Sequence, residues 1–105
     1  MRRGEVRWYR FSTPDTRRPV LIPTRSSALE FLGAVTFAPI TSTIREIPSE
    51  IRLTQADGMA RECAVNLDHV QTVNRVKVGP VIASASPGKM SEIRAALLFA
   101  LGFWP

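Results

Sequence analysis

Short apolar segments separated by turn residues constrain the fold of this chain more than any other feature of its sequence. Several segments alternate between apolar and polar positions, and the breaks between them carry Pro, Gly, Asp, Ser or Thr. This pattern is typical of short β-strands joined by tight loops. The predicted strands occupy residues 6–11, 19–24, 33–41, 50–54, 64–67 and 78–85. Because proline cannot donate a ladder hydrogen bond, Pro39 predicts an edge position or a bulge in the third strand.

One segment near the C-terminus has a helical period instead. Ser86 can cap a helix whose first position is Pro87, and Gly102 suits the position just beyond its end. The apolar residues that recur on one face are Met90, Ile93, Leu97, Ala100 and Leu101. We therefore expect a core-packing helix without a chemical role. Short strands followed by this helix predict a small, mainly β, barrel-like fold with a helix packed on it, as a single domain over residues 1–105.

The excess positive charge is concentrated in the first 25 residues. Seven arginines and two acidic residues lie there, which accounts for the net charge of +5, whereas the later residues carry seven charges of each sign. Arginine forks match phosphate oxygens better than lysine ammonium groups do. Trp8, Tyr9 and Phe11 are interleaved with these arginines, which suits either stacking on single-stranded nucleic acid or core packing. We expect a polyanionic partner, either nucleic acid or an acidic protein tail.

Several other classes of protein and site are disfavoured. Cys63 is the only cysteine, so it cannot form an internal disulfide and is expected to be a small buried residue. No pair of metal ligands at helical or knuckle spacing, no glycine-rich phosphate loop and no nucleophile elbow is present, so we expect neither a metal nor a cofactor. The sequence also lacks a signal-peptide pattern and the roughly 18 apolar residues of a membrane span, so we expect a cytoplasmic protein with no membrane partner.

Polar residues stand at the boundaries of two predicted strands. Arg17 and Arg18 precede the strand that begins at Pro19, and proline favours an extended conformation for the residue before it. Thr41 and Ser42 lie where the third strand ends. If these strand ends meet at one rim of the barrel, guanidinium and hydroxyl groups could clamp a phosphodiester and stabilise a charged transition state. The alternatives are a surface arginine at a strand start and hydroxyls that bond to the backbone of a turn.

A polar run at residues 66–72 supplies two further candidates. His69 is of the residue type that ordinarily changes protonation near neutral pH, so it could act as a general acid or base, or could bind a nucleobase. Asp68 could bind a base edge or orient a partner. The alternative for His69 is a partly buried structural histidine.

Five motifs occur in an order that resembles the MazF/PemK toxins, which are ribonucleases of bacterial toxin–antitoxin systems. No single motif is distinctive, but together they extend over nearly the whole chain. The motifs are Arg3-Gly4-Glu5-Val6, Arg18-Pro19-Val20-Leu21, Pro39-Ile40-Thr41-Ser42 with residues 47–51, residues 64–68 with 71–73, and a helix from Ser86-Pro87 to Ala100-Leu101-Gly102.

The resemblance implies an SH3-like barrel of the CcdB/PemK type that works as a homodimer. It implies metal-independent, sequence-selective cleavage of single-stranded RNA to 2′,3′-cyclic phosphate and 5′-hydroxyl ends. It also implies neutralisation by a cognate antitoxin with an acidic, largely disordered tail. The family pattern assigns catalytic roles to Arg18 and Thr41, and Asp68 and His69 fall where members contact a base. We add Arg17, Asp15 and Ser42 as RNA-binding or accessory residues.

The chain departs from the family pattern in two places. Many members carry a longer first loop with a Glu-Gln-Gly type segment, whereas only residues 12–16 remain here, and Asp15 is a loose substitute for its substrate contacts. The position of His69 is often Gln in the family. Two alternatives stay open: a non-enzymatic toxin of the same fold that acts on a protein such as gyrase, and an SH3-like module that binds an acidic peptide.

Overall fold

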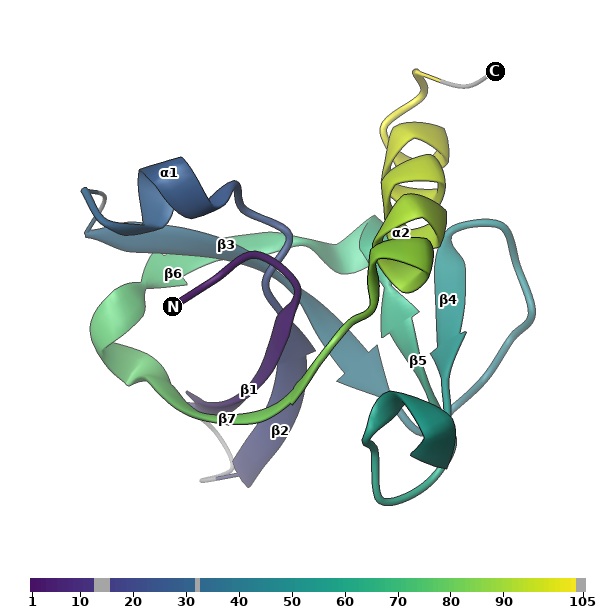
Figure 1. The fold of residues 1–105 in the computed structure, drawn as a ribbon, viewed down its shortest axis with the longest axis horizontal. Coiled ribbons are helices and arrows are strands. Elements are labelled where there is room, and N and C mark those ends of the chain that lie inside the picture. Colours follow the sequence, from purple (N-terminus) through teal and green to yellow (C-terminus); the bar gives the residue numbers. More distant parts are fainter. Residues whose placement is uncertain (13–15, 32, 104–105) are drawn as a thin grey trace.

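The computed structural model describes residues 1–12, 16–31 and 33–103, in which β-strands predominate (Figure 1). The strands are β1 (Glu5–Phe11), β2 (Thr16–Leu21), β3 (Ala34–Thr41), β4 (Glu50–Leu53), β5 (Cys63–Asn66), β6 (Gln71–Asn74) and β7 (Val78–Ser84). The helices are α1 (Ser26–Leu29) and α2 (Pro87–Ala100), with short 3-10 turns η1 (Gln55–Asp57), η2 (Leu67–His69) and η3 (Arg75–Lys77). The six predicted strands and the C-terminal helix are confirmed, whereas β6 was not predicted.

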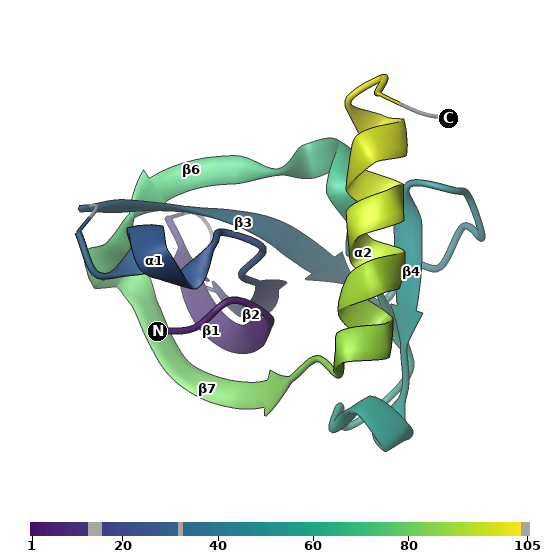
Figure 2. The same cartoon turned by 45° about the horizontal axis from the view of Figure 1, so that its top comes forward.

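β3 is the centre of the sheet. The strand order is β4-β5-β3-β2-β1-β7, and β6 pairs with the first half of β3. β6 and β7 continue into one another through η3 and curve around β1 and β2 (Figures 1 and 2). The result is a curled half-barrel with α2 standing beside β4 and β5, which confirms the predicted small, mainly β barrel with a C-terminal helix.

The end of β2 and the second half of β3 are covered on both faces, which explains why their apolar runs are continuous. Val20 packs with Tyr9 and Phe37 in a cluster inside the half-barrel. The next residue, Leu21, packs into a second cluster on the opposite face. α2 contributes Ile93 to that second cluster. The strands that carry the predicted Arg and Thr residues are therefore held between two cores.

The predicted start of the second strand is wrong, and so is the edge position, one of the two alternatives predicted for Pro39. Arg17 and Arg18 lie within β2, not before it, because β2 begins at Thr16. Pro39 lies in a central strand, opposite Val20 of β2, and not at an edge. On the other side of β3 the pairing changes from β6, at residues 34–37, to β5, at residues 40–41. Pro39 lies in the gap between these two ladders, where a residue without an N–H is tolerated.

The end of α2 differs from the sequence prediction by one residue. Ser86 accepts the N–H of Lys89 and Pro87 is the first helical residue, as predicted. Gly102 adopts a left-handed φ of 83° just beyond the end, also as predicted. Leu101, however, is 56% exposed, because it follows the last helical turn, whereas Ala96, which was not predicted to face the core, is buried.

Cys63 is buried, as predicted. Burial raises the pKa of the Cys63 thiol, and the negative charge of Asp57 adds to the effect, so the thiol stays protonated and unreactive near neutral pH. Among the described residues, neither α2 nor the shorter α1 has the length and apolar character needed to cross a membrane.

The carboxylate of Glu5 ties the N-terminal turn to β1. Its Oε1 accepts the backbone N–H of Arg2 at 2.8 Å and the Nε–H of Arg7 at 2.9 Å. Burial by itself would raise the pKa of Glu5, but the hydrogen bonds from Arg2 and Arg7 and the charge of Arg7 outweigh it and lower the pKa below the ordinary value of 4.5. The ionised carboxylate therefore stabilises the folded state.

Replacing Glu5 by Gln should make the unfolding free energy of the protein less sensitive to acidification. Because the folded-state pKa is lowered, the contribution of Glu5 is fully present above its unfolded pKa and is lost as the pH falls through the folded one. Urea unfolding between about pH 6 and pH 3 should show a smaller loss of unfolding free energy in Glu5→Gln than in the wild type. Glu92→Gln, at an exposed position on α2, is the control. Equal pH slopes for Glu5→Gln and the wild type would contradict this role.

Candidate functional site

The pairing of β2 with β3 brings Arg18 and Thr41 to the same place. The two strands are antiparallel, with Leu21 opposite Ala38 and Val20 opposite Pro39. Continuing this alignment by two residues places Arg18 opposite Thr41. Directly opposed residues of an antiparallel pair project their side chains to the same face. The sequence prediction that these two side chains converge at one rim is in agreement with this register.

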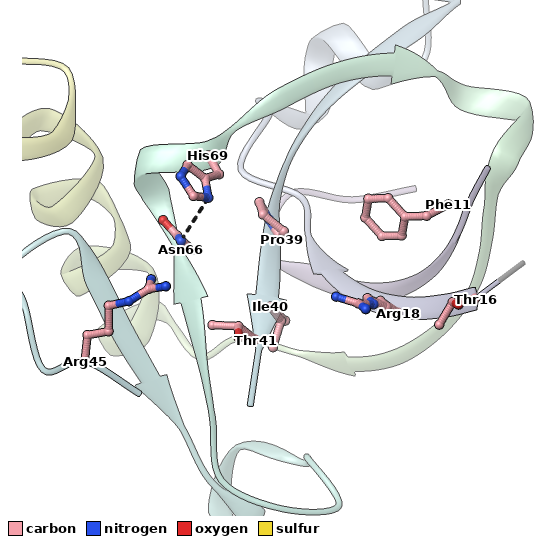
Figure 3. A pocket seen from close by; sticks show the side chains of 9 residues that line it. All are labelled: Phe11, Thr16, Arg18, Pro39, Ile40, Thr41, Arg45, Asn66 and His69. Atoms are coloured by element: carbon pink, nitrogen blue, oxygen red, sulfur yellow. Dashed lines mark hydrogen bonds between the residues drawn. The ribbon is translucent and has the colours of Figure 1, made fainter. Parts of the chain in front are cut away.

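Arg18 and Thr41 line a pocket of about 360 Å³ (Figure 3). Phe11 and Thr16 line it from the β1–β2 end, and Asn66 and His69 line it from β5 and η2. Arg45, from the loop between β3 and β4, completes the polar part of the lining. The pocket therefore combines two guanidinium groups, two threonine hydroxyls, an amide, an imidazole and one aromatic ring.

A second pocket of about 430 Å³ adjoins the first on the opposite face of β2 and β3. It is more apolar, and Trp8, Met59 and Cys63 are among its lining residues. Arg18, Ile40 and Thr41 line both pockets. We call these three residues the ridge, because they separate the two pockets.

The hydroxyl of Thr41 is oriented by the chain that follows it. Its Oγ1 accepts the backbone N–H of Thr43 at 3.1 Å. This is one of the alternatives that the sequence left open, but it does not remove Thr41 from the site, because the hydroxyl proton stays available to donate. Arg18 is exposed, so its guanidinium can reach a ligand in either pocket.

Asn66 sets the proton position on His69. The Oδ1 of buried Asn66 accepts the backbone N–H of Asp68 at 2.9 Å, which turns Nδ2 toward His69. The Nδ2 of Asn66 lies 3.2 Å from the Nδ1 of His69 and can only donate (Figure 3). The neutral imidazole therefore accepts at Nδ1 and carries its proton on Nε2. His69 is exposed, which excludes the buried structural alternative.

The remaining predicted residues are spread around this centre. Ser42 lines the second pocket with the ridge. Arg17 lies over the ring of Trp8, with Cζ 5.0 Å from the ring centroid, and so belongs to the opposite face of β2 from Arg18. Asp68 is exposed and is absent from both linings, and its Oδ2 accepts the hydroxyl of Ser49 at 2.5 Å. Asp15 lies outside the described residues.

Six residues that line the first pocket were not among the predicted site residues: Phe11, Thr16, Pro39, Ile40, Arg45 and Asn66. Phe11 was recognised only as one of several aromatics among arginines, which was the available signal. Asn66 stood at the start of the polar run, where nothing in the sequence distinguished it from its neighbours. Arg45 lies in a loop, and its position depends on a contact with Glu50 that no sequence period indicates.

Known proteins resemble this chain over nearly its whole length. The sequence model of a family described as PemK-like, MazF-like toxin of type II toxin–antitoxin systems matches residues 2–101. "Probable endoribonuclease MazF2" of Mycobacterium tuberculosis is 37% identical over 93 residues, which cover 88% of this chain and 89% of that protein. A solved endoribonuclease in complex with its cognate antitoxin, from a mycobacterial species, has a TM-score of 0.87 and 26% identity, covering 100% of this chain and 99% of its own. The M. tuberculosis toxin MazF-mt6 has a TM-score of 0.85 and 28% identity, covering 93% and 96%.

Long-range ¹H–¹⁵N NMR correlations should show the Nε2–H tautomer of neutral His69 in the wild type at alkaline pH. Replacing Asn66 by Asp should reverse this preference, because a carboxylate at that position accepts a hydrogen bond from Nδ1–H and cannot donate one to Nδ1. Asn74→Asp, at the same kind of 3-10 cap but outside the lining of the pocket, is the control. A predominant Nδ1–H tautomer in the wild type would show that the Asn66 contact does not set the proton position.

Proposed function

This chain belongs to the PemK-like, MazF-like toxin family of type II toxin–antitoxin systems, and we propose that it is a toxin endoribonuclease that cleaves single-stranded RNA sequence-selectively and without a metal. The observation that carries the proposal is the register that brings the side chains of Arg18 and Thr41 into one pocket. The arginine-rich start of the chain adds attraction for a polyanion. The proposed place of action is the cytoplasm.

In the proposed reaction the 2′-hydroxyl of one nucleotide attacks the adjacent phosphorus. The 2′-oxygen forms a bond to phosphorus and loses its proton, while the bond to the 5′-oxygen breaks and that oxygen gains a proton. The products are a 2′,3′-cyclic phosphate and a 5′-hydroxyl end. Arg18 stabilises the negative charge on the non-bridging oxygens, and the hydroxyl of Thr41 donates a further hydrogen bond to them.

His69 is the candidate for proton transfer. Arginine stays protonated at working pH, so Arg18 serves as an electrostatic group and not as a base. Nδ1 of His69 is occupied by Asn66, so Nε2 is the nitrogen left to exchange a proton with RNA or to donate to a base. Asp68 is exposed beside it, and we assign it a contact with a base edge at the rim of the pocket.

The proposed partners are those implied by the family. A cognate antitoxin with an acidic, disordered tail would find exposed guanidinium groups at Arg17 and Arg18 on β2. Such a tail would compete with RNA for the same charges, which explains neutralisation without a separate regulatory site. The functional unit is proposed to be a homodimer.

Purified protein should cut a long single-stranded RNA at discrete positions in excess EDTA and leave 5′-hydroxyl ends. Arg18→Ala should cut about 100-fold more slowly or worse, the scale expected for the loss of one transition-state donor. Arg94→Ala removes an exposed arginine on α2 and should keep the wild-type rate. End mapping and cleavage rates measure both effects.

The outcomes separate the proposed function from its alternatives. Cleavage that requires a metal would contradict the mechanism, and equal cleavage by the wild type and Arg18→Ala would indicate a contaminating nuclease. No cleavage, combined with inhibition of gyrase or binding of an acidic peptide, would favour one of the two non-enzymatic readings.

The pH dependence of cleavage tests His69 separately. If His69 transfers a proton, the cleavage rate should change with pH near neutrality. This limb of the pH–rate profile should vanish in His69→Asn. His69→Gln supplies the residue common in the family, and it should show the same loss of the limb. A full rate with an unchanged pH profile in His69→Asn would remove His69 from proton transfer and leave Arg18 and Thr41 in place.

A further inference from the structure

A second arginine faces the Arg18–Thr41 pocket from the opposite side. Arg45 lies in the loop between β3 and β4, and Figure 3 shows it across Thr41 from Arg18. Two guanidinium groups therefore flank one pocket that also contains Asn66 and His69. Arg45 has no role in the proposed catalytic step.

Arg45 is held in place by a buried carboxylate. Oε1 of Glu50 accepts the backbone N–H of Arg45 at 2.9 Å, and Oε2 lies 3.3 Å from NH1 of the same residue. The side chain of Glu50 is 2% exposed, whereas that of Arg45 is 53% exposed. The carboxylate of Glu50 thus holds the backbone of the loop at Arg45 and one nitrogen of its guanidinium, NH1. About half of the Arg45 side chain stays accessible to solvent.

The guanidinium of Arg45 retains donors for a ligand. A guanidinium has five N–H donors, and within the described ranges the guanidinium of Arg45 makes one contact, from NH1 to Glu50. Arg7 shows the contrasting case of a structural arginine. Its Nε binds Glu5, its NH1 binds the carbonyl of Gly79, and its side chain is 20% exposed. Arg45, in contrast, is anchored through NH1, and its other N–H groups are available to bind a ligand.

We propose that Arg45 binds the backbone phosphate next to the one held by Arg18, so that the pocket grips two successive phosphates of single-stranded RNA. The inference rests on the proposed function for the class of ligand. The nucleotide between the two phosphates then faces the side of the pocket formed by Asn66 and His69. Because Glu50 offsets part of the positive charge, Arg45 contributes mainly through oriented hydrogen bonds from its fork.

The competing explanation is that Arg45 serves only to neutralise Glu50. The two explanations differ in what a substitution changes. A structural role predicts a lower melting temperature with unchanged RNA binding. A phosphate contact predicts weaker binding and a smaller dependence of binding on salt, because fewer counterions are released.

The experiment compares Arg45→Gln with Arg52→Gln in the intact protein. Gln at position 45 keeps the backbone N–H that Glu50 accepts and can still donate from its side chain, so the loop is preserved. Arg52 is a matched control, because it is similarly exposed and paired with Glu46 and Glu62, yet it lines neither pocket. The probe is a pool of 24-nucleotide random single-stranded RNAs with 2′-fluoro groups, which removes the nucleophile of the proposed reaction. Fluorescence anisotropy at several salt concentrations measures binding.

Arg45→Gln should weaken binding about 10-fold at moderate salt, as expected for one charge-assisted contact. It should also reduce the slope of log K against log salt by about 0.7, the value for one phosphate on a single strand. Arg52→Gln should change neither quantity. Arg45→Lys should restore the slope but not the full affinity, because it keeps the charge and loses the fork.

Wild-type affinity and salt slope in Arg45→Gln would overturn the proposal. An equal loss of affinity and slope in Arg45→Lys and Arg45→Gln would also overturn it, because it would indicate that both substitutions disturb the loop. Cleavage of unmodified RNA by the wild type tests the proposed function independently. Cleavage together with unchanged binding in Arg45→Gln would remove this inference alone. If the protein binds RNA without cleaving it, and Arg45→Gln weakens binding as predicted, the proposed nuclease activity would be refuted and the proposed phosphate contact of Arg45 supported.

Discussion

The pairing of β2 with β3 between two hydrophobic clusters is the constraint on which the site depends. Val20 belongs to the cluster inside the half-barrel and Leu21 to the cluster beneath α2. A slip of one residue in register would exchange these environments and would move the side chain of Arg18 to the other face, away from Thr41. The packing of apolar residues that never contact a ligand therefore decides where the guanidinium and the hydroxyl meet.

Buried polar residues form a supporting layer beneath the pocket. Ser49, Glu50 and Asn66 are the buried polar and charged residues of the described chain. Each of them binds a more exposed residue at or near the pocket: Asp68, Arg45 and His69, respectively. No buried side-chain nitrogen or oxygen among the described residues lacks a partner. These buried polar groups are satisfied by their hydrogen bonds, and the same bonds orient the more exposed side chains of Asp68, Arg45 and His69.

The sequence was informative where a local pattern carried the structure. Strand alternation and the Ser86-Pro87 cap located the main elements. Arg18 and Thr41 were correctly expected to lie close together, although Arg18 lies within β2 and not before it. β6 was missed because Gln71 to Asn74 is a largely exposed strand without an apolar period. The roles of Asn66 and Arg45 were missed because they depend on specific hydrogen bonds to His69 and Glu50 and not on any repeat along the chain.

The ridge formed by Arg18, Ile40 and Thr41 has a consequence for inhibitor design. Its two sides differ in chemistry: one pocket, of about 360 Å³, is lined by polar and cationic groups, and the other, of about 430 Å³, is richer in apolar side chains. A fragment bound in one pocket leaves the other unoccupied. Joining two fragments through an anionic centre placed over Arg18 would make the second binding step intramolecular and would raise overall affinity without improving either fragment.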